Sequence, residues 1–208
     1  MTLPDQLKQA TAATQAALEE TPAAKALARG EFDRDGYANL LGQMGRLHAS
    51  LETALAHKPD YATLYRPADM ARAGAIGRDL AALDCEPPAR LCDAVTNLIG
   101  LFRQWGEQSP WMLIGALYVV EGSRLPSLDS VRTVAEALGV EVRPGAGVDY
   151  HLDGIAARPM VWQQFKAILA SVPFSEAQKE NICRAATVTA QGLHGLYAAA
   201  RLAEPVVA

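Results

Sequence analysis

The stretch from Trp111 to Val120 constrains the fold most, because every residue in it except Gly115 is apolar. A helix that is apolar on all sides is buried inside a protein. The run is well short of the roughly 20 residues that cross a bilayer, so we expect a central helix surrounded by other helices. Glu121-Gly122-Ser123 and then Pro126-Ser127 follow it. Because proline donates no backbone hydrogen bond, this helix is predicted to bend or end there.

The rest of the chain has the apolar spacing of amphipathic helices and lacks the alternation typical of strands. Residues 140–158 contain three glycines and a proline and are predicted to form a long loop. The sequence therefore predicts an all-α fold of seven or eight helices, in a single domain spanning residues 1–208. A first helix should run to about Ala28 and a second from Asp33 to before Lys58, with further starts at Pro67, Pro87-Pro88, Ser109-Pro110, Pro159 and Ser175.

Composition excludes several classes of partner. The net charge is −4 and there is no dense run of Lys and Arg, which argues against nucleic acid and against an anionic membrane surface. The N-terminal residues have no pattern of a secretory signal. The three cysteines, Cys85, Cys92 and Cys183, are odd in number and lack a C-x-x-C spacing. We expect reduced thiols in a cytoplasmic protein.

Short sequence words in four predicted helices occur in an order that resembles bacterial haem oxygenases. They are Leu7 to Glu19, which includes Thr11, then Leu47-His48-Ala49-Ser50-Leu51-Glu52, Gly115 to Ser123, and Trp162 with Phe165. The resemblance covers nearly the whole chain. It implies a haem oxygenase-like multi-helix bundle in which haem is held between the first helix and the bent central helix, which is the distal helix of that family.

The resemblance also shows where the chain departs from the family. In the family a neutral imidazole from the first helix ligates the haem iron, and Gln15 occupies that position here. An amide oxygen is a weak donor compared with imidazole. Lys8 stands two turns earlier, where the family has a basic residue that meets a haem propionate. On general grounds an exposed lysine near a helix start is a solvated side chain.

The second departure is on the distal side. The family pattern is Gly-Ser-x-Leu-Gly-Gly, because a residue without Cβ lets the helix backbone approach the haem closely. The corresponding residues here are Gly122-Ser123-Arg124-Leu125-Pro126-Ser127. The first glycine and the serine are kept, whereas proline and serine replace the paired glycines. A thin, flexible wall is thereby predicted to become thicker and stiffer.

These two changes favour a degenerate haem oxygenase-like protein that does not degrade haem by the family mechanism. This interpretation assigns no catalytic residue, no resident haem and no metal, and it expects a binding or regulatory module that acts through a protein partner or a small ligand. The alternative is an active haem oxygenase, converting haem to biliverdin, iron and CO, with water, Gln15 or a relocated histidine on the iron. A third possibility is a different small planar molecule in the same cavity.

The histidines and carboxylates offer no clear substitute site. A relocated ligand would have to be His48, His57, His151 or His194. His48 is expected to be a buried histidine with satisfied hydrogen bonds, and no spacing groups the others. A di-iron site is disfavoured because the chain contains no Glu-x-x-His motif.

Overall fold

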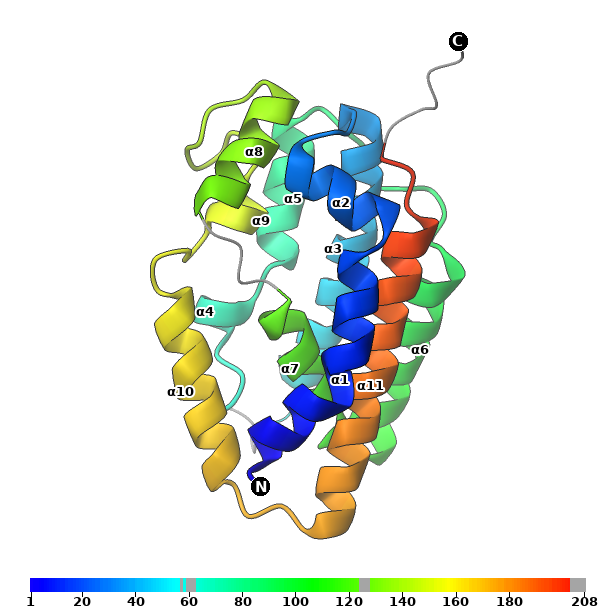
Figure 1. Ribbon diagram of the computed structural model, residues 1–208, viewed down its shortest axis with the longest axis vertical. Coiled ribbons are helices and arrows are strands. Elements are labelled where there is room, and N and C mark those ends of the chain that lie inside the picture. Colours follow the sequence, from blue (N-terminus) through cyan, green and yellow to red (C-terminus); the bar gives the residue numbers. More distant parts are fainter. Residues whose placement is uncertain (57, 59–62, 124–127, 203–208) are drawn as a thin grey trace.

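The computed structural model describes residues 1–56, 58, 63–123 and 128–202. Over these residues the all-α prediction is confirmed: helices pack side by side into a bundle, and no strand occurs among them (Figure 1). No helix in the described part of the chain is both long and apolar enough to cross a membrane. The elements are α1 (Leu3–Glu19), α2 (Pro22–Arg29), α3 (Arg34–Ala56), α4 (Pro67–Met70), α5 (Ala73–Ala82), α6 (Asp93–Gln108), α7 (Met112–Gly122), α8 (Leu128–Leu138), α9 (Asp149–Leu152), α10 (Arg158–Ser171) and α11 (Glu176–Ala199).

The apolar run forms α7, and the prediction of a buried central helix is confirmed. Every residue from Leu113 to Val120 is buried, and α7 packs mainly on α11, with α3, α6 and α1 on other sides. Gly115 makes the contact with α11 possible. A Cβ at Gly115 would overlap the carbonyl oxygen of Ile182 and lie 2.9 Å from the backbone nitrogen of Ala186.

The first predicted helix is wrong in its extent, because the chain breaks it into α1 and α2. Glu20 ends α1, and the side chain of Thr21 caps α2 by accepting a hydrogen bond from the backbone nitrogen of Ala24 at 3.3 Å. Pro22 then fills the first position of α2, where a missing N–H costs nothing. Threonine followed by proline is a local start signal that outweighs the continuing apolar stripe. Gly30 ends α2 with φ of +69°.

Further differences lie in short elements. The helix expected from Pro67 divides into α4 and α5, α6 begins at Asp93 and not at Pro87-Pro88, and the 140–158 loop contains the single turn α9. These divisions account for the larger number of helices. The helix start predicted at Ser175 is confirmed, and Ser175 forms a capping box with Gln178 in which both reciprocal bonds are present. The expected break at Pro126 lies outside the described residues.

Asp79 of α5 holds the 140–158 segment in place. Its two carboxylate oxygens accept hydrogen bonds from the backbone nitrogens of Asp149, at 2.6 Å, and Tyr150, at 2.7 Å. The Asp79 side chain is fully buried, and it acts as the cap of α9 from a distant part of the chain. On the other side Nε of Arg78 donates to Asp149 at 2.7 Å. Two adjacent residues of α5 thus fix a segment that local sequence leaves irregular.

Burial of Asp79 predicts a pH-dependent stability. Burial raises the pKa of this carboxyl to about 6, against the lowering effect of its two backbone hydrogen bonds. Between pH 4 and pH 6 the folded protein therefore binds more protons at Asp79 than the unfolded chain, so the free energy of unfolding falls as the pH rises through this window, by up to about 3 kcal/mol. Urea unfolding at pH 4, 5, 6 and 7 measures this slope.

Asp79→Asn should flatten the dependence of the unfolding free energy on pH, at the cost of one backbone hydrogen bond. Asp35→Asn, at an exposed position, should leave that dependence unchanged. An unchanged slope in Asp79→Asn would contradict the assignment.

Candidate functional site

An open cleft of about 700 Å³ lies between α1, α10 and the C-terminal end of α7. Figure 1 shows α7 between α10 and α1 in the lower half of the view. A pocket of this size is in the range that holds a small organic ligand or cofactor. Its lining residues are Pro4, Asp5, Lys8, Thr11, Ala12, Gln15, Ala16 and Glu19 on α1, Tyr118, Val119, Gly122 and Ser123 at the end of α7, and Trp162 and Lys166 on α10.

The α1 wall brings together two of the residues singled out by sequence, Lys8 and Gln15. Seven residues make two turns, so both side chains lie on the helix face that lines the cleft. Both are exposed, and Nε2 of Gln15 donates a hydrogen bond to the Glu19 carboxylate at 3.1 Å. Between them Thr11 is buried, and its hydroxyl donates to the carbonyl oxygen of Leu7 at 2.9 Å. Gln15 therefore presents to the cleft an amide that already has a partner.

The opposite wall contains Gly122 and Ser123, the two distal residues that the structure describes. Ser123 turns its hydroxyl back to the carbonyl oxygen of Val120, at 2.9 Å. A Cβ at Gly122 would lie 3.3 Å from Cη2 of Trp162, which is tighter than ordinary contact. Gly122 thus lets the Trp162 indole of α10 pack against α7. The other predicted distal residues, Pro126 and Ser127, lie outside the described residues.

Aromatic rings form the side of the cleft next to α10. The ring centroid of Trp162 is 5.1 Å from that of Tyr118 and 5.6 Å from that of Phe165, on which it stacks. Burial raises the pKa of the Tyr118 phenol, and the negative charge of Asp5 adds to this effect. Tyr118 is therefore held as a neutral hydroxyl. Tyr118 and Trp162 line the cleft and offer an apolar surface to a flat ligand, with Phe165 buried behind them.

Lys166 is a site residue that sequence reasoning missed. It follows Phe165 and stands one turn after Trp162, and its Nζ lies 5.6 Å from the centroid of the Trp162 ring. This i to i+4 spacing was the available signal. Among the described residues no carboxylate lies within ion-pair distance of Lys8 or Lys166. The cleft therefore has a cation on α1 and another on α10.

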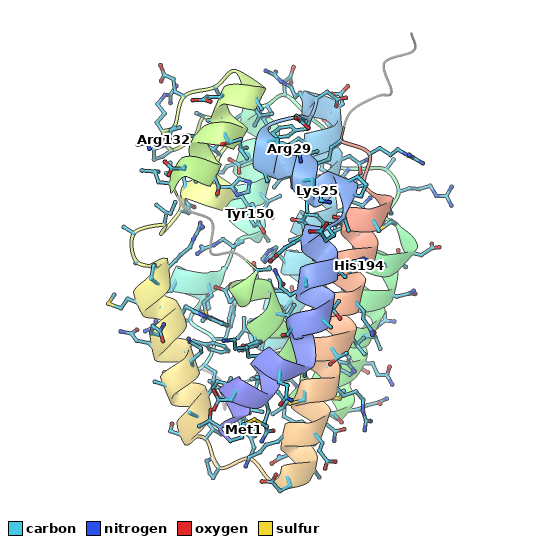
Figure 2. The ribbon with its side chains drawn as sticks, viewed as in Figure 1. Met1, Lys25, Arg29, Arg132, Tyr150 and His194 are labelled. Carbon is cyan, nitrogen blue, oxygen red and sulfur yellow. The ribbon has the colours of Figure 1, made fainter. Side chains whose placement is uncertain are left out.

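The described histidines do not line the cleft. His48 is buried in α3, with Nδ1 3.8 Å from Glu52 and its ring edge-on to Tyr150. His151 has Nε2 3.0 Å from the hydroxyl of Tyr37. Figure 2 shows Tyr150 in the upper half of the view and His194 on α11, whereas Met1 marks the lower end of α1. His57 lies outside the described residues.

Among its described residues the cleft offers no imidazole, thiolate or thioether to haem iron. Its polar groups are of other kinds. They are the Gln15 amide, two lysine ammonium groups without a lone pair, hydroxyl groups, and the carboxylates of Asp5 and Glu19 at the α1 edge. No cluster of three or more His, Cys, Asp or Glu that could hold a metal occurs among the residues that the structure describes. What the cleft does offer is an aromatic wall, a close backbone approach at Gly122 and two lysines with no carboxylate in ion-pair distance among the described residues.

Comparison with known proteins gives a consistent result. A family model described as Heme oxygenase matches residues 1–191. The chain is similar in structure to the haem oxygenase of Leptospira interrogans, with 20% identity, a TM-score of 0.84, and 95% of this chain and 99% of that chain covered. It is also similar to haem oxygenase-1 of the cyanobacterium Synechocystis sp. PCC6803 in complex with haem, with 16% identity, a TM-score of 0.83, and 95% and 91% covered. Haem oxygenase 2 of Chlamydomonas reinhardtii matches with 14% identity, a TM-score of 0.81, and 99% and 100% covered. No curated protein sequence matches the chain significantly.

Proposed function

Because this chain belongs to the haem oxygenase family, we propose that its cleft binds a flat tetrapyrrole dicarboxylate and does not degrade haem by the family mechanism. One observation carries the proposal. Where the family is expected to place its iron-binding imidazole, the cleft wall presents the amide of Gln15, which donates to Glu19 at 3.1 Å. The protein would then act as a binding or regulatory module.

The side chains that line the cleft determine whether it can ligate the iron of haem. Haem iron in proteins is held by imidazole, thiolate, thioether or phenolate. Among the described residues of the cleft only Tyr118 belongs to these types, and the raised pKa of its phenol disfavours the phenolate. The residues present therefore do not fit the iron of haem. No step of an oxidation is assigned to them.

The organic part of a tetrapyrrole fits the cleft better than its metal does. Lys8 and Lys166 lie on two different walls and are available for carboxylate groups, which form charge-assisted hydrogen bonds with ammonium groups. Trp162 and Tyr118 supply apolar ring surface, and Gly122 carries no Cβ toward Trp162. This combination supports a ligand that is planar, aromatic and anionic at its edge.

The distal sequence supports the loss of the family reaction independently. Pro126 and Ser127 replace the paired glycines of the family. Proline fixes its own φ and serine restores a Cβ, so the backbone there has less freedom to approach a bound ring. Both residues lie outside the described part of the chain.

The alternative function is an active haem oxygenase with an unusual axial group. The observation that favours it is the open cleft itself, with Gly122 and Ser123 kept at its wall. Among the described residues Gln15 is the one at the expected axial position, with water as the other candidate ligand, because His48, His151 and His194 do not line the cleft. A different small planar molecule in the cleft remains a third possibility. Titration of the protein with haemin and with the metal-free porphyrin separates these cases.

We expect the wild-type protein to bind haemin and metal-free protoporphyrin IX with dissociation constants within about threefold of each other, because a missing iron bond leaves both ligands with the same contacts. Absorbance and tryptophan fluorescence titrations measure the two constants. With ascorbate and oxygen the haemin complex should give no biliverdin absorbance.

Matched lysine variants show whether the cleft is the binding site. Lys8→Ala and Lys166→Ala should each weaken both ligands by several-fold, since each removes a charge-assisted contact. Lys25→Ala, at an exposed position on α2 (Figure 2), should leave both constants unchanged. A sharp Soret band, haemin binding far tighter than that of the metal-free ring, and turnover to biliverdin would overturn the proposal in favour of the active enzyme.

A further inference from the structure

A second groove, of about 760 Å³, runs between α3 and α6 and shares no lining residue with the cleft. Its floor is built from small residues, among them Ala49 and Ala54 of α3 and Gly100 and Gly106 of α6. Longer polar side chains also line the groove. The remaining lining residues are Arg46, Ser50, Thr53, Lys58, Thr96, Ile99, Arg103 and Glu107.

The two helices run in the same direction along the groove. Near one end Nε2 of Gln43 donates a hydrogen bond to the carbonyl oxygen of Arg90, and Oε1 of Gln43 accepts one from the backbone nitrogen of Cys92, both at 3.1 Å. Near the other end a Cβ on Gly106 would lie 3.6 Å from Cβ of Ala54. From Thr96 to Glu107 the groove follows α6 for about 16 Å, or three helical turns.

The charge of this groove is opposite to that of the whole chain. Arg46, Lys58 and Arg103 line it, against the single carboxylate of Glu107, although the chain has a net charge of −4. None of the three cations lies within ion-pair distance of a carboxylate in the described part of the protein. Arg46 and Arg103 are exposed and point their charge to solvent. The groove is thus a local positive site on an acidic protein.

The spacing of the cations selects the kind of occupant. Arg46 and Lys58 lie twelve residues apart in sequence, and α3 alone rises about 15 Å from Arg46 to its end at Ala56, so one small anion cannot reach both. An amphipathic helix can, because its side chains on one face recur every three to four residues, about 5–6 Å apart. The small floor leaves room for the ridge of a third helix, as in other helix-in-groove complexes. We propose that the α3–α6 groove binds an acidic amphipathic helix of a partner protein.

A second copy of this chain is a poorer occupant. A two-fold contact would bring each groove against its own equivalent, so that cations would face cations. Like charges at such an interface disfavour association. The partner is therefore expected to supply an acidic surface of its own.

The probe is a synthetic helical peptide of about four turns with an alanine ridge flanked by glutamates, compared with the same peptide carrying lysines. Fluorescence anisotropy should show binding of the glutamate peptide alone, weakened by added salt. Arg46→Glu with Arg103→Glu should weaken it at least about tenfold and confer binding of the lysine peptide. Arg132→Glu with Arg184→Glu changes the net charge equally at exposed positions outside the groove, and should have no effect.

A second pair of variants tests shape without changing charge. No atom lies within 4 Å of a Cβ built at Gly100, so both Gly100→Ala and Gly100→Leu should fold. The alanine variant should bind the glutamate peptide as the wild type does, and the leucine variant, which fills the groove, should lose binding at least about tenfold. Equal binding of the two peptides, or of the two Gly100 variants, overturns the proposal. So does binding to phosphatidylserine vesicles with no peptide binding, or a dimer in sedimentation that Gly100→Leu dissociates.

Discussion

A Gln15→His variant is expected to bind haemin at least about tenfold more tightly than the wild type, a gain of about 1.4 kcal/mol or more. Position 15 already lines the cleft, on the same helix face as Lys8. A neutral imidazole there would give the iron a strong donor that the amide lacks. A sharpened, shifted Soret band in a haemin titration is the measurement.

Two controls make this result specific. Metal-free protoporphyrin IX should bind Gln15→His and wild type equally, because it has no metal for the imidazole to ligate. Gln9→His makes the same chemical change at an exposed position on α1 that does not line the cleft, so it should leave haemin binding unchanged. If Gln15→His gains nothing, haemin cannot approach that wall, as expected if Pro126 and Ser127 fill the space above it. Haemin would then bind only weakly, through contacts of its organic ring and without an iron ligand.

Gly115→Ala is expected to destabilise the fold by about 3 kcal/mol or more, because overpacking against backbone cannot be relieved by a side-chain rotation. The added methyl group would overlap the carbonyl oxygen of Ile182 and approach the backbone nitrogen of Ala186, so α7 and α11 would have to separate. These two helices form the centre of the bundle. Urea unfolding monitored by circular dichroism gives the change in the free energy of unfolding.

Gly77→Ala is the matched control. Gly77 also lies inside a helix, α5, but nothing lies within 4 Å of a Cβ built there. Alanine has the higher helix propensity, so this variant should be as stable as the wild type or more stable by about 0.5–1 kcal/mol. Equal stability of the Gly115 and Gly77 variants would mean that α7 and α11 are not in backbone contact.

The sequence predicted the helices with strong local signals. The wholly apolar run predicted the buried α7, and Ser175 was correctly predicted as the start of α11. The sequence-based prediction failed at Thr21-Pro22, where a local break interrupts a continuous apolar stripe. It also failed where a short helical turn depends on a residue far away in the sequence. The turn α9 is capped by Asp79 of α5, seventy residues earlier along the chain. No window of local sequence contains that interaction.

The candidate site divides in the same way. Lys8, Gln15, Gly122 and Ser123 were named from sequence, and the structure brings them to one cleft. Lys166 was not named, because a lysine on an amphipathic helix is usually a solvated side chain. Only the packing of α10 beside α1 and α7 places it at the cleft.

By itself the sequence determined the all-α class and the central helix, because each depends on residue type and on spacing within one helix. It also placed Gln15 where the resemblance implies an axial histidine. Tertiary structure alone decided that a cleft lies between α1, α7 and α10, that Gln15 lines it with its amide already hydrogen-bonded to Glu19, and that the described histidines lie elsewhere. Those facts depend on how helices far apart in the sequence pack together. Helix packing is set by the shape and burial of many side chains at once, which no local pattern records.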